Sequence, residues 1–466
     1  MIPMPSRRWL KRADQPLSVM ADDNRARLKQ WLESGEARLH PLTLPQRELW
    51  EASPVPVGDV ANHICAFIEV KGAISRVDCD SAIERVVERQ EVLRLSILPG
   101  KAQPVQMVRS TRPINMAYRE LTPSQRTPEG LEEAMQEVFL EPFDLVRGPL
   151  YRIVFLQRGP GDLVMVFAIH HTIADGWTLG VFVQDLVAAY IMSRRGGKDP
   201  LPPVPLAYSA WGAADRAFWT PEMLAEKMTF WKPRLSGAQH LWTAPDDLTK
   251  AAGPLRRHVS MVPPELTTAV RELARTTGTT LFSTLLTAFQ WTLARWSGKN
   301  DITVGSPVAN RTKPNVRETM GSFAGNVPLR GQVETSQTFA ATLRQSHADN
   351  MDAFAHAMPF VELVRLLGDQ AAEVRHPVYS VRFALQNHPV PDVSLPGLVM
   401  KLRMRSTGTA RFDLGCEVTE DGTSLEVVWL FRPSLFSQAD VDTLDGLFRA
   451  VLTKVCDSPE TRASSV

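Results

Sequence analysis

The chain has 466 residues, of which 44% are hydrophobic, 8% are aromatic and 22% are charged, and its 52 lysines and arginines balance 51 aspartates and glutamates. This length exceeds what one ordinary hydrophobic core organises, so we expect two lobes. The balanced charge supplies no overall field for nucleic acid or an anionic membrane, and no apolar run reaches the roughly 18 residues of a membrane-spanning helix.

The N-terminal segment is basic, and its opening residues MIPMPSRRWLKRADQ are not followed by the apolar core of a secretory signal. A helix is predicted over residues 23–39, with Leu28, Trp31 and Leu32 at helical spacing. We interpret residues 1–38 as an N-terminal extension, either a docking element for a partner or a loose leader. The four cysteines are widely scattered without a CxxC pair, which indicates reduced thiols and a cytoplasmic protein.

A mixed α/β pattern begins at Leu42 and runs to a proline-rich loop. Alternating apolar residues predict strands, and apolar residues at helical spacing predict helices. The sequence RGPGD is a turn by composition and joins two of the strands. The predicted elements of this first block are a strand over residues 63–70, a helix over 80–97, strands over 150–157 and 162–170, a helix after them, and a loop over 194–206.

A second α/β block begins near His258. Glycines end its first two helices, as expected for helix C-termini. Its predicted elements are helices over residues 263–278 and 280–298, strands over 301–309, 376–387 and 424–432, and a closing helix over 438–455. The expected fold class is therefore α/β, with two lobes that each contain a sheet backed by helices.

Residues 164–182, VMVFAIHHTIADGWTLGVF, place two adjacent histidines at the end of a predicted strand. Neighbouring side chains of a strand point to opposite faces, so His170 and His171 do not share a metal ion, and the pair lacks the HExxH spacing. One histidine is then buried and orienting, and the other faces a cleft as a general base; alternatively, both simply end the strand. Asp175, directly before Gly176, suits a helix N-cap.

Three common catalytic motifs are absent from the chain. There is no GxSxG nucleophile elbow, no GxxxxGK[ST] phosphate-binding loop and no GxGxxG dinucleotide fingerprint. The sequence therefore gives no support to a serine hydrolase, a P-loop nucleotide hydrolase or a dinucleotide-dependent enzyme.

The segment HHTIADGWT resembles the HHxxxDG motif of the condensation-domain superfamily, which includes chloramphenicol-acetyltransferase-like enzymes. Other segments resemble the motifs of nonribosomal-peptide condensation domains and follow in the order of that family. The resemblance covers roughly residues 40 to 455. The segments are LTLPQRELW (42–50), RQEVLRLSI (89–97), FWKPRLSGA (230–238), MGSFAGNVPLR (320–330), HAMPFVELV (356–364) and RHPVYSVRFALQN (375–387).

This resemblance implies two chloramphenicol-acetyltransferase-like lobes in a V-shaped pseudo-dimer with a substrate tunnel between them. The implied division is the extension 1–38, an N-terminal lobe 39–215 that carries HHxxxDG, a C-terminal lobe 216–458 and a tail 459–466. The enzyme is expected to hold no cofactor and no metal. Its substrates are expected to be bound as thioesters to the phosphopantetheine of a carrier protein that acts in trans. The enzyme is expected to be a monomer with no nucleic-acid or membrane partner.

The site residues follow from the same resemblance, motif by motif. It implies that His171 is the catalytic residue and that His170 is structural. It further implies that Asp175 pairs with Arg311 of the segment VANRTK and holds a loop in place without transferring protons. Gly176 is expected to give the backbone room to turn close to the tunnel.

Two departures from the family pattern concern the acceptor side. Gly325 stands where the family has an asparagine, and Asn326 follows one position later. Ala210 and Ala214, in YSAWGAA, stand where the family has an acidic residue and a tryptophan. Because these substitutions remove polar and steric constraints, we expect recognition of the acceptor to change.

The implied function is that of a freestanding condensation enzyme of nonribosomal peptide or polyketide biosynthesis. It would transfer an acyl, polyketidyl or peptidyl chain from a carrier thioester to an amine or hydroxyl, with chain release as one outcome. An acyl-CoA-dependent O- or N-acyltransferase of the same superfamily is one alternative. The other is a non-catalytic carrier-binding module, which the intact His171 and Asp175 disfavour. The donor, the acceptor and the choice between amide and ester stay open.

Overall fold

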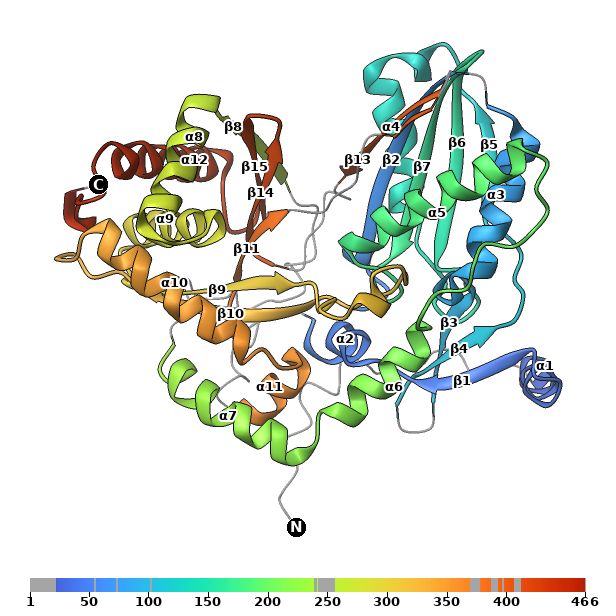
Figure 1. The fold of residues 1–466 in the computed structure, drawn as a ribbon, viewed down its shortest axis with the longest axis horizontal. Coiled ribbons are helices and arrows are strands. Elements are labelled where there is room, and N and C mark those ends of the chain that lie inside the picture. The colour runs from blue at the N-terminus through green and yellow to red at the C-terminus, as the bar shows by residue number, and fades with distance from the viewer. Residues whose placement is uncertain are drawn as a thin grey trace.

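The chain folds into two lobes, each built on a six-stranded sheet packed against helices. In Figure 1 the lobes meet in the lower half of the view and diverge toward the top. This arrangement confirms the predicted α/β fold class. The computed structural model describes residues 22–53, 56–72, 74–100, 103–238, 241, 256–368, 378–386, 393–395, 398–405 and 412–465.

The sheet of the first lobe has the strand order β12-β13-β2-β7-β6-β5. Strand β7 lies near its middle and is buried on both faces, which requires the continuous apolar run that the sequence shows there. The main elements of this lobe are β2 (His63–Gly72), α3 (Arg76–Arg89), β5 (Met116–Glu120), α4 (Pro128–Leu140), β6 (Tyr151–Gly159), β7 (Asp162–His170) and α5 (Gly176–Arg194).

The predicted helix over residues 80–97 is wrong at both ends. Helix α3 begins at Arg76, because Ser75 caps it by accepting a hydrogen bond from the Asp78 backbone N–H. It ends at Arg89, and a 3₁₀ turn and strand β3 (Leu95–Leu98) follow. The apolar residues after Arg89 fit a helix in sequence, but in the folded protein they enter a second, smaller sheet.

That smaller sheet has the order β1-β4-β3 and holds part of the predicted extension. Its other strands are β1 (Ala37–Pro41) and β4 (Val105–Arg109), so the boundary predicted at residue 38 falls inside β1. Helix α1 (Asp22–Glu33) precedes it and is shorter than predicted. Trp31 packs against this sheet, with the Arg109 guanidinium 3.9 Å from the centre of its ring. Residues 1–21 of the extension lie outside the described residues.

Removing residues 1–34 tests the extension without cutting β1. We expect the core to stay folded and, if the chain turns over a small thioester as the family resemblance implies, to keep that activity. The free energy of unfolding should fall by about 1–3 kcal/mol, because Leu28 and Trp31 lose their apolar contacts. Urea unfolding measures that loss. If the extension docks a carrier protein, kcat/KM for the loaded carrier falls in the same variant, and an unchanged value supports the leader interpretation.

The sheet of the second lobe has the order β10-β9-β11-β14-β15-β8, and the predicted helices and strands of the second block are all present. The strands are β8 (Arg256–Val262), β9 (Asp301–Val308), β10 (Gly325–Gln332), β11 (Val381–Gln386), β14 (Leu414–Asp421) and β15 (Ser424–Phe431). The helices of this lobe are α8 (Pro264–Thr277), α9 (Leu281–Ser297), α10 (Phe339–Ala355) and α12 (Gln438–Asp457).

Four further helices lie where the lobes meet, in the lower part of Figure 1. An ion pair of 2.8 Å between Arg47 and Glu362 joins two of them. These helices are α2 (Leu44–Arg47), α6 (Tyr208–Phe218), α7 (Pro221–Leu235) and α11 (Phe360–Leu367). None of the helices in the described part of the chain is long and apolar enough to cross a membrane.

Two segments from the second half of the chain complete the first lobe. Strand β13 (Leu398–Arg405) pairs antiparallel with β2, and β12 (Val393–Leu395) lies beyond it. Residues 309–324, between β9 and β10, contribute Val316, Met320 and Phe323 to the core of the first lobe. The predicted division into residues 39–215 and 216–458 does not account for these segments, because strand pairing and apolar burial join residues that are distant in sequence.

Candidate active site

His170 is the last residue of β7 and lies opposite His63 of β2 in the sheet. Its side chain is fully buried, and its Nε2 lies 2.9 Å from the Val57 carbonyl oxygen. A carbonyl only accepts, so Nε2 carries the proton and Nδ1 accepts a hydrogen bond from the Thr172 backbone N–H at 3.2 Å. Both ring nitrogens are satisfied in a neutral imidazole, as a structural role for this residue requires.

His171 follows directly, at the point where the strand ends and a turn begins. Its backbone N–H donates to the Asn62 carbonyl at 2.7 Å, and the Ile173 N–H donates back to the His170 carbonyl at 3.0 Å. Unlike His170, its side chain is partly exposed. The two histidines therefore occupy different environments, as the alternation of a strand predicts.

Asp175 is the N-cap of α5 and is almost completely buried. Its Oδ1 accepts hydrogen bonds from the backbone N–H and the hydroxyl of Thr178, both at 2.9 Å, in a capping box. Its Oδ2 accepts from the Phe323 backbone N–H at 3.1 Å. The Asp175 carboxylate therefore caps α5, as its position before Gly176 suggested, and it also forms the ion pair with Arg311 that the family resemblance implied.

Arg311 is the partner of that carboxylate. Its Nη2 lies 3.1 and 3.3 Å from the two Asp175 oxygens, which is the predicted ion pair. Its Nη1 donates to the carbonyls of Val316 and Thr319 at 2.8 and 2.7 Å. Burial lowers the pKa of the Arg311 guanidinium, while Asp175 acts in the opposite direction. Arg311 therefore organises residues 309–324 and ties them to the start of α5.

Thr178 and Tyr208 strengthen the same junction; they lie in the segments HHTIADGWT and YSAWGAA but were not predicted as site residues. The D-x-x-T capping pattern was the only local sequence signal for Thr178. The Thr178 hydroxyl oxygen lies 3.0 Å from the Gly321 carbonyl oxygen and accepts a hydrogen bond from the Gly321 N–H at 3.1 Å. A Cβ at Gly321 would lie 2.3 Å from the Tyr208 ring, so only glycine fits there.

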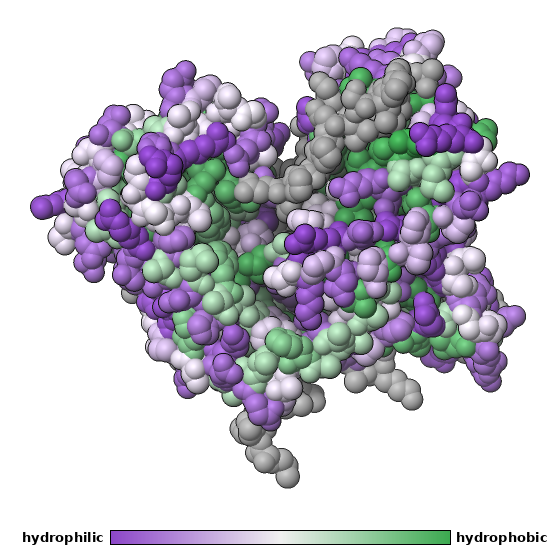
Figure 2. All heavy atoms as spheres, in the orientation of Figure 1, coloured by the Kyte–Doolittle hydropathy of each residue, from purple (hydrophilic) through white to green (hydrophobic). Residues whose placement is uncertain are grey.

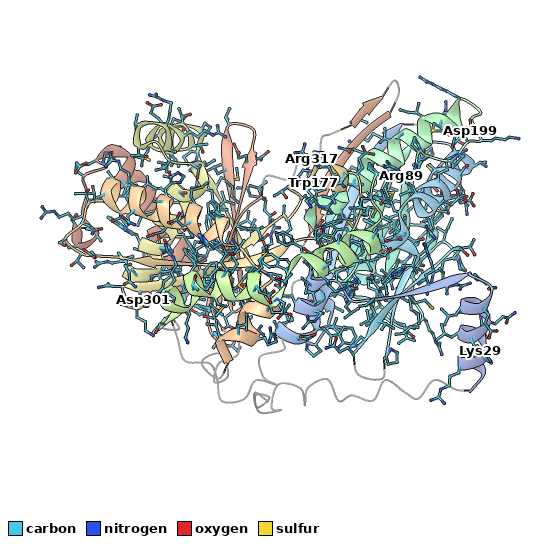
Figure 3. The ribbon with its side chains drawn as sticks, turned by 60° about the horizontal axis from the view of Figure 1, so that its bottom comes forward. Lys29, Arg89, Trp177, Asp199, Asp301 and Arg317 are labelled. Atoms are coloured by element: carbon cyan, nitrogen blue, oxygen red, sulfur yellow. The ribbon has the colours of Figure 1, made fainter. Side chains whose placement is uncertain are left out.

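A further contact joins α5 to the same segment. Figure 3 shows Trp177 beside Arg317, whose carbonyl accepts from the indole N–H at 3.0 Å.

Gly176 is the first residue of α5. It does not appear among the glycines of the described chain that have positive φ, so its backbone conformation does not itself require glycine. The predicted need for room near a tunnel stays a prediction.

The acceptor-side residues fall on two different elements. Gly325 opens β10, and a Cβ there would lie 3.1 Å from the Asn310 side-chain nitrogen, so the space left by the missing side chain is smaller than the substitution suggests. Asn326 donates a hydrogen bond to Glu48 across the junction between the lobes. Ala210 and Ala214 are exposed on α6.

His63 makes the region behind the histidine pair sensitive to pH. Burial lowers the pKa of its imidazole, although its Nδ1–H donates to the Phe139 carbonyl at 2.8 Å. The unfolded chain binds a proton near pH ~6.5, whereas the folded protein binds it only at lower pH. The contribution of His63 to stability is therefore present above pH ~6.5 and declines as the pH falls toward the lowered pKa.

Replacing His63 tests this effect. His63→Asn keeps a donor for the Phe139 carbonyl and removes the titrating group, so its unfolding free energy should fall less between about pH 7.5 and pH 5.5 than that of the unmodified protein. Urea unfolding at both pH values measures the difference. An equal fall in the two proteins contradicts the assignment, because the other titrating groups, including His40, are common to both.

Figure 2 shows that the surface is hollowed between the two lobes. Within the described ranges, no group of three or more His, Cys, Asp or Glu side chains is arranged to hold a metal ion.

Comparison with known proteins gives a family and a fold. The model of the family described as "Condensation domain" matches residues 36–466. Phosphinothricin tripeptide synthetase PhsC of Streptomyces viridochromogenes is 29% identical over 431 residues, which cover 90% of this chain and 39% of that protein. Chondramide synthase cmdD of Chondromyces crocatus is 28% identical over 432 residues, 91% of this chain and 11% of that protein. The chain thus spans well under half the length of these relatives.

Solved structures share the fold over nearly the whole chain. SgcC5 of Streptomyces globisporus aligns with a TM-score of 0.77 at 22% identity, covering 91% of this chain and all of that one. The X-domain from teicoplanin biosynthesis aligns with a TM-score of 0.80 at 21% identity, covering 91% and 97%.

Proposed function

The chain belongs to the condensation-domain family, and we propose that it transfers an acyl, polyketidyl or peptidyl chain from a carrier-protein phosphopantetheine thioester to an amine or hydroxyl. The bond formed is C–N or C–O, the bond broken is C–S, and the proton of the nucleophile ends on the released thiol. The carrier protein acts in trans, and chain release is one outcome of the reaction. The enzyme needs no cofactor of its own for this chemistry.

The observation that supports this proposal most is the position of His171. It is partly exposed at the end of a buried strand, directly after the fully buried His170. The helix that follows is anchored by the Asp175–Arg311 pair to a segment from the other half of the chain. An imidazole so placed can remove the proton of an incoming nucleophile or stabilise the charge that develops on it.

The relative sizes of the contributions favour positioning over base catalysis. A general base contributes about 10²- to 10⁴-fold, or ~3–5 kcal/mol. Orientation of two tethered partners contributes about 7–11 kcal/mol. We therefore propose that a tunnel between the lobes, which holds donor and acceptor in register, contributes at least as much as His171.

A donor comparison tests the function. A carrier protein loaded with an acyl-phosphopantetheine and the same acyl group on CoA are each offered to the enzyme with an amine, an alcohol and an aminoacyl-carrier. Intact-protein and product mass spectrometry follow the acyl group. Transfer from the carrier that depends on His171 supports the proposal. Equal or better use of the CoA thioester favours the acyl-CoA-dependent alternative, and carrier binding without any transfer favours the non-catalytic module.

Acceptor choice is the second aspect of the proposal. Gly325 and Ala210 lack the amide and the carboxylate that the family pattern has at these positions. A hydrogen bond to a charged group contributes about 1.5–3 kcal/mol, which is enough to change the preferred nucleophile. We therefore expect a free small amine or alcohol to be preferred to a carrier-bound α-amino acid.

Ala210→Asp tests this expectation, with Ala213→Asp as the matched control, since both alanines are exposed on α6. Restoring the acid at 210 should raise the use of aminoacyl-carrier relative to a free alcohol by about tenfold, the equivalent of ~1.4 kcal/mol, whereas the control should not. Competition between the two acceptors gives the ratio. If the unmodified enzyme already prefers aminoacyl-carrier by a wide margin, the expectation is wrong and the enzyme forms ordinary peptide bonds.

A further inference from the structure

The turn that precedes β2 lies directly against the histidine pair. It contains Val57 and ends at Asn62, whose side chain is fully buried. The Asn62 backbone carbonyl accepts the hydrogen bond from the His171 N–H at 2.7 Å. Asn62, which directly precedes β2, is therefore hydrogen-bonded to the backbone of His171.

The Asn62 side chain holds this turn in shape. Its Nδ2 donates to the carbonyls of Pro56 and Val57, both at 2.9 Å. Carbonyls only accept, so the orientation of the amide group is settled: its nitrogen faces the turn. Both N–H groups of the amide donate hydrogen bonds. A side chain that replaced Asn62 would have to match its size and supply two donors.

The Val57 carbonyl connects His170 with Asn62, and Asn62 in turn binds the backbone of His171. It accepts from Asn62 Nδ2 and also from His170 Nε2, each at 2.9 Å. One carbonyl thus receives a hydrogen bond from the residue that holds the His171 backbone and from the histidine that precedes His171. A shift of the Val57 carbonyl therefore alters both hydrogen bonds at once.

We propose that Asn62 is a positioning residue for His171: it sets the direction of the His171 imidazole through the Val57 carbonyl and its own backbone carbonyl. The proposal rests on the proposed function, since it assigns Asn62 a part in the chemistry of His171. A displacement of a reacting group by about 1 Å can cost about 10²-fold in rate. Asn62 needs no contact with substrate to have an effect of that size.

The first test is a double-mutant cycle in single-turnover acyl transfer. Asn62→Ala should lower the rate about 10- to 10²-fold with KM for the loaded carrier unchanged, because only the reacting group moves. In the His171→Ala background the same change should have almost no further effect. An equal loss in both backgrounds overturns the proposal, since a merely structural asparagine would act independently of His171.

Two further variants keep the test informative. Asn62→Ser retains one donor and should fall between the unmodified protein and Asn62→Ala, and it takes the place of Asn62→Ala in the cycle if that variant does not fold. Asp59→Ala is the matched control: the Asp59 carboxylate caps the same turn by accepting from the Ala61 N–H at 2.8 Å, whereas the Val57 carbonyl accepts from Asn62 and His170. It should lose stability and keep its rate.

Backbone hydrogen exchange separates this proposal from the proposed function. The His171 amide, which donates to Asn62, should exchange at least about tenfold faster in Asn62→Ala and at an unchanged rate in Asp59→Ala. This measurement requires no substrate. A protein that transfers no acyl group but shows this exchange pattern refutes the function and supports the positioning, whereas unchanged His171 exchange in Asn62→Ala refutes the positioning alone.

Discussion

His171→Ala is expected to lower turnover by about 10²- to 10⁴-fold, the range that a general base contributes. His171 is the partly exposed member of the histidine pair, and its backbone is held by the Asn62 carbonyl, so removing the imidazole should leave the fold intact. Rates with a loaded carrier, together with the thermal unfolding midpoint of both proteins, measure the two effects separately.

His170→Ala is the comparison for that result. The His170 side chain is fully buried and bonded to Val57 and Thr172, so its removal should lower stability and soluble yield. The folded fraction should lose less turnover than His171→Ala does. Mild and equal losses of turnover at both positions, in proteins with the native fold, would refute the assignment of His171 as the catalytic residue.

Asp175→Asn is expected to destabilise the protein by about 3–5 kcal/mol, the cost of removing one partner of a buried ion pair. Asparagine keeps an oxygen for the Thr178 cap, so the loss reports the charge that faces Arg311 together with the acceptor of the Phe323 N–H. Turnover should also fall at temperatures where the variant is folded, because residues 309–324 lose their attachment to α5. Urea unfolding and turnover at low temperature measure these effects.

A matched control lies in the second lobe. Asp445 of α12 is also buried and paired with an arginine, Arg449, at 2.9 Å, on a helix that packs in the second lobe. Asp445→Asn should cost stability without a comparable loss of turnover in the folded protein. The double variant Asp175→Asn with Arg311→Met should be less destabilised than the sum of the single changes, because the uncompensated charge is gone. Simple additivity, or equal turnover in Asp175→Asn and Asp445→Asn, would refute the anchoring role.

The accuracy of the sequence predictions followed the range of the interactions involved. Strand β7 and helices α8 and α9 were predicted well, because a buried apolar run and glycines at helix ends are local signals. The helix predicted over residues 80–97 was wrong at its ends, and the residues after Arg89 have an apolar pattern that suits helix and strand equally. Their pairing with β4, which lies farther along the chain, decides between the two.

The residues of the candidate site likewise fall into those that local sequence patterns predicted and those that only tertiary contacts revealed. Alternation along a strand predicted that one histidine is buried and the other faces a cleft, and only the family resemblance implied that His170 is the structural one. Capping chemistry placed Asp175 at the start of α5. Arg311 was named only through the family resemblance, because an arginine in a loop is indistinguishable in sequence from a solvated one. Asn62 gave no comparable signal. Thr178 and Tyr208 lie in segments that resemble the family motifs but were not predicted as site residues, since their importance comes from carbonyl groups and rings brought to them by other segments.

Local patterns were enough to predict the α/β class, the helices and strands with strong periodicity, and the residues of HHxxxDG. The contribution of β12, β13 and residues 309–324 to the first lobe, and the position of Gly325 opposite the Asn310 side chain, emerged only from the folded arrangement of the chain. Backbone propensity and capping act over a few neighbouring residues, whereas the burial of apolar side chains and the pairing of charges depend on surfaces that exist only once the chain has folded.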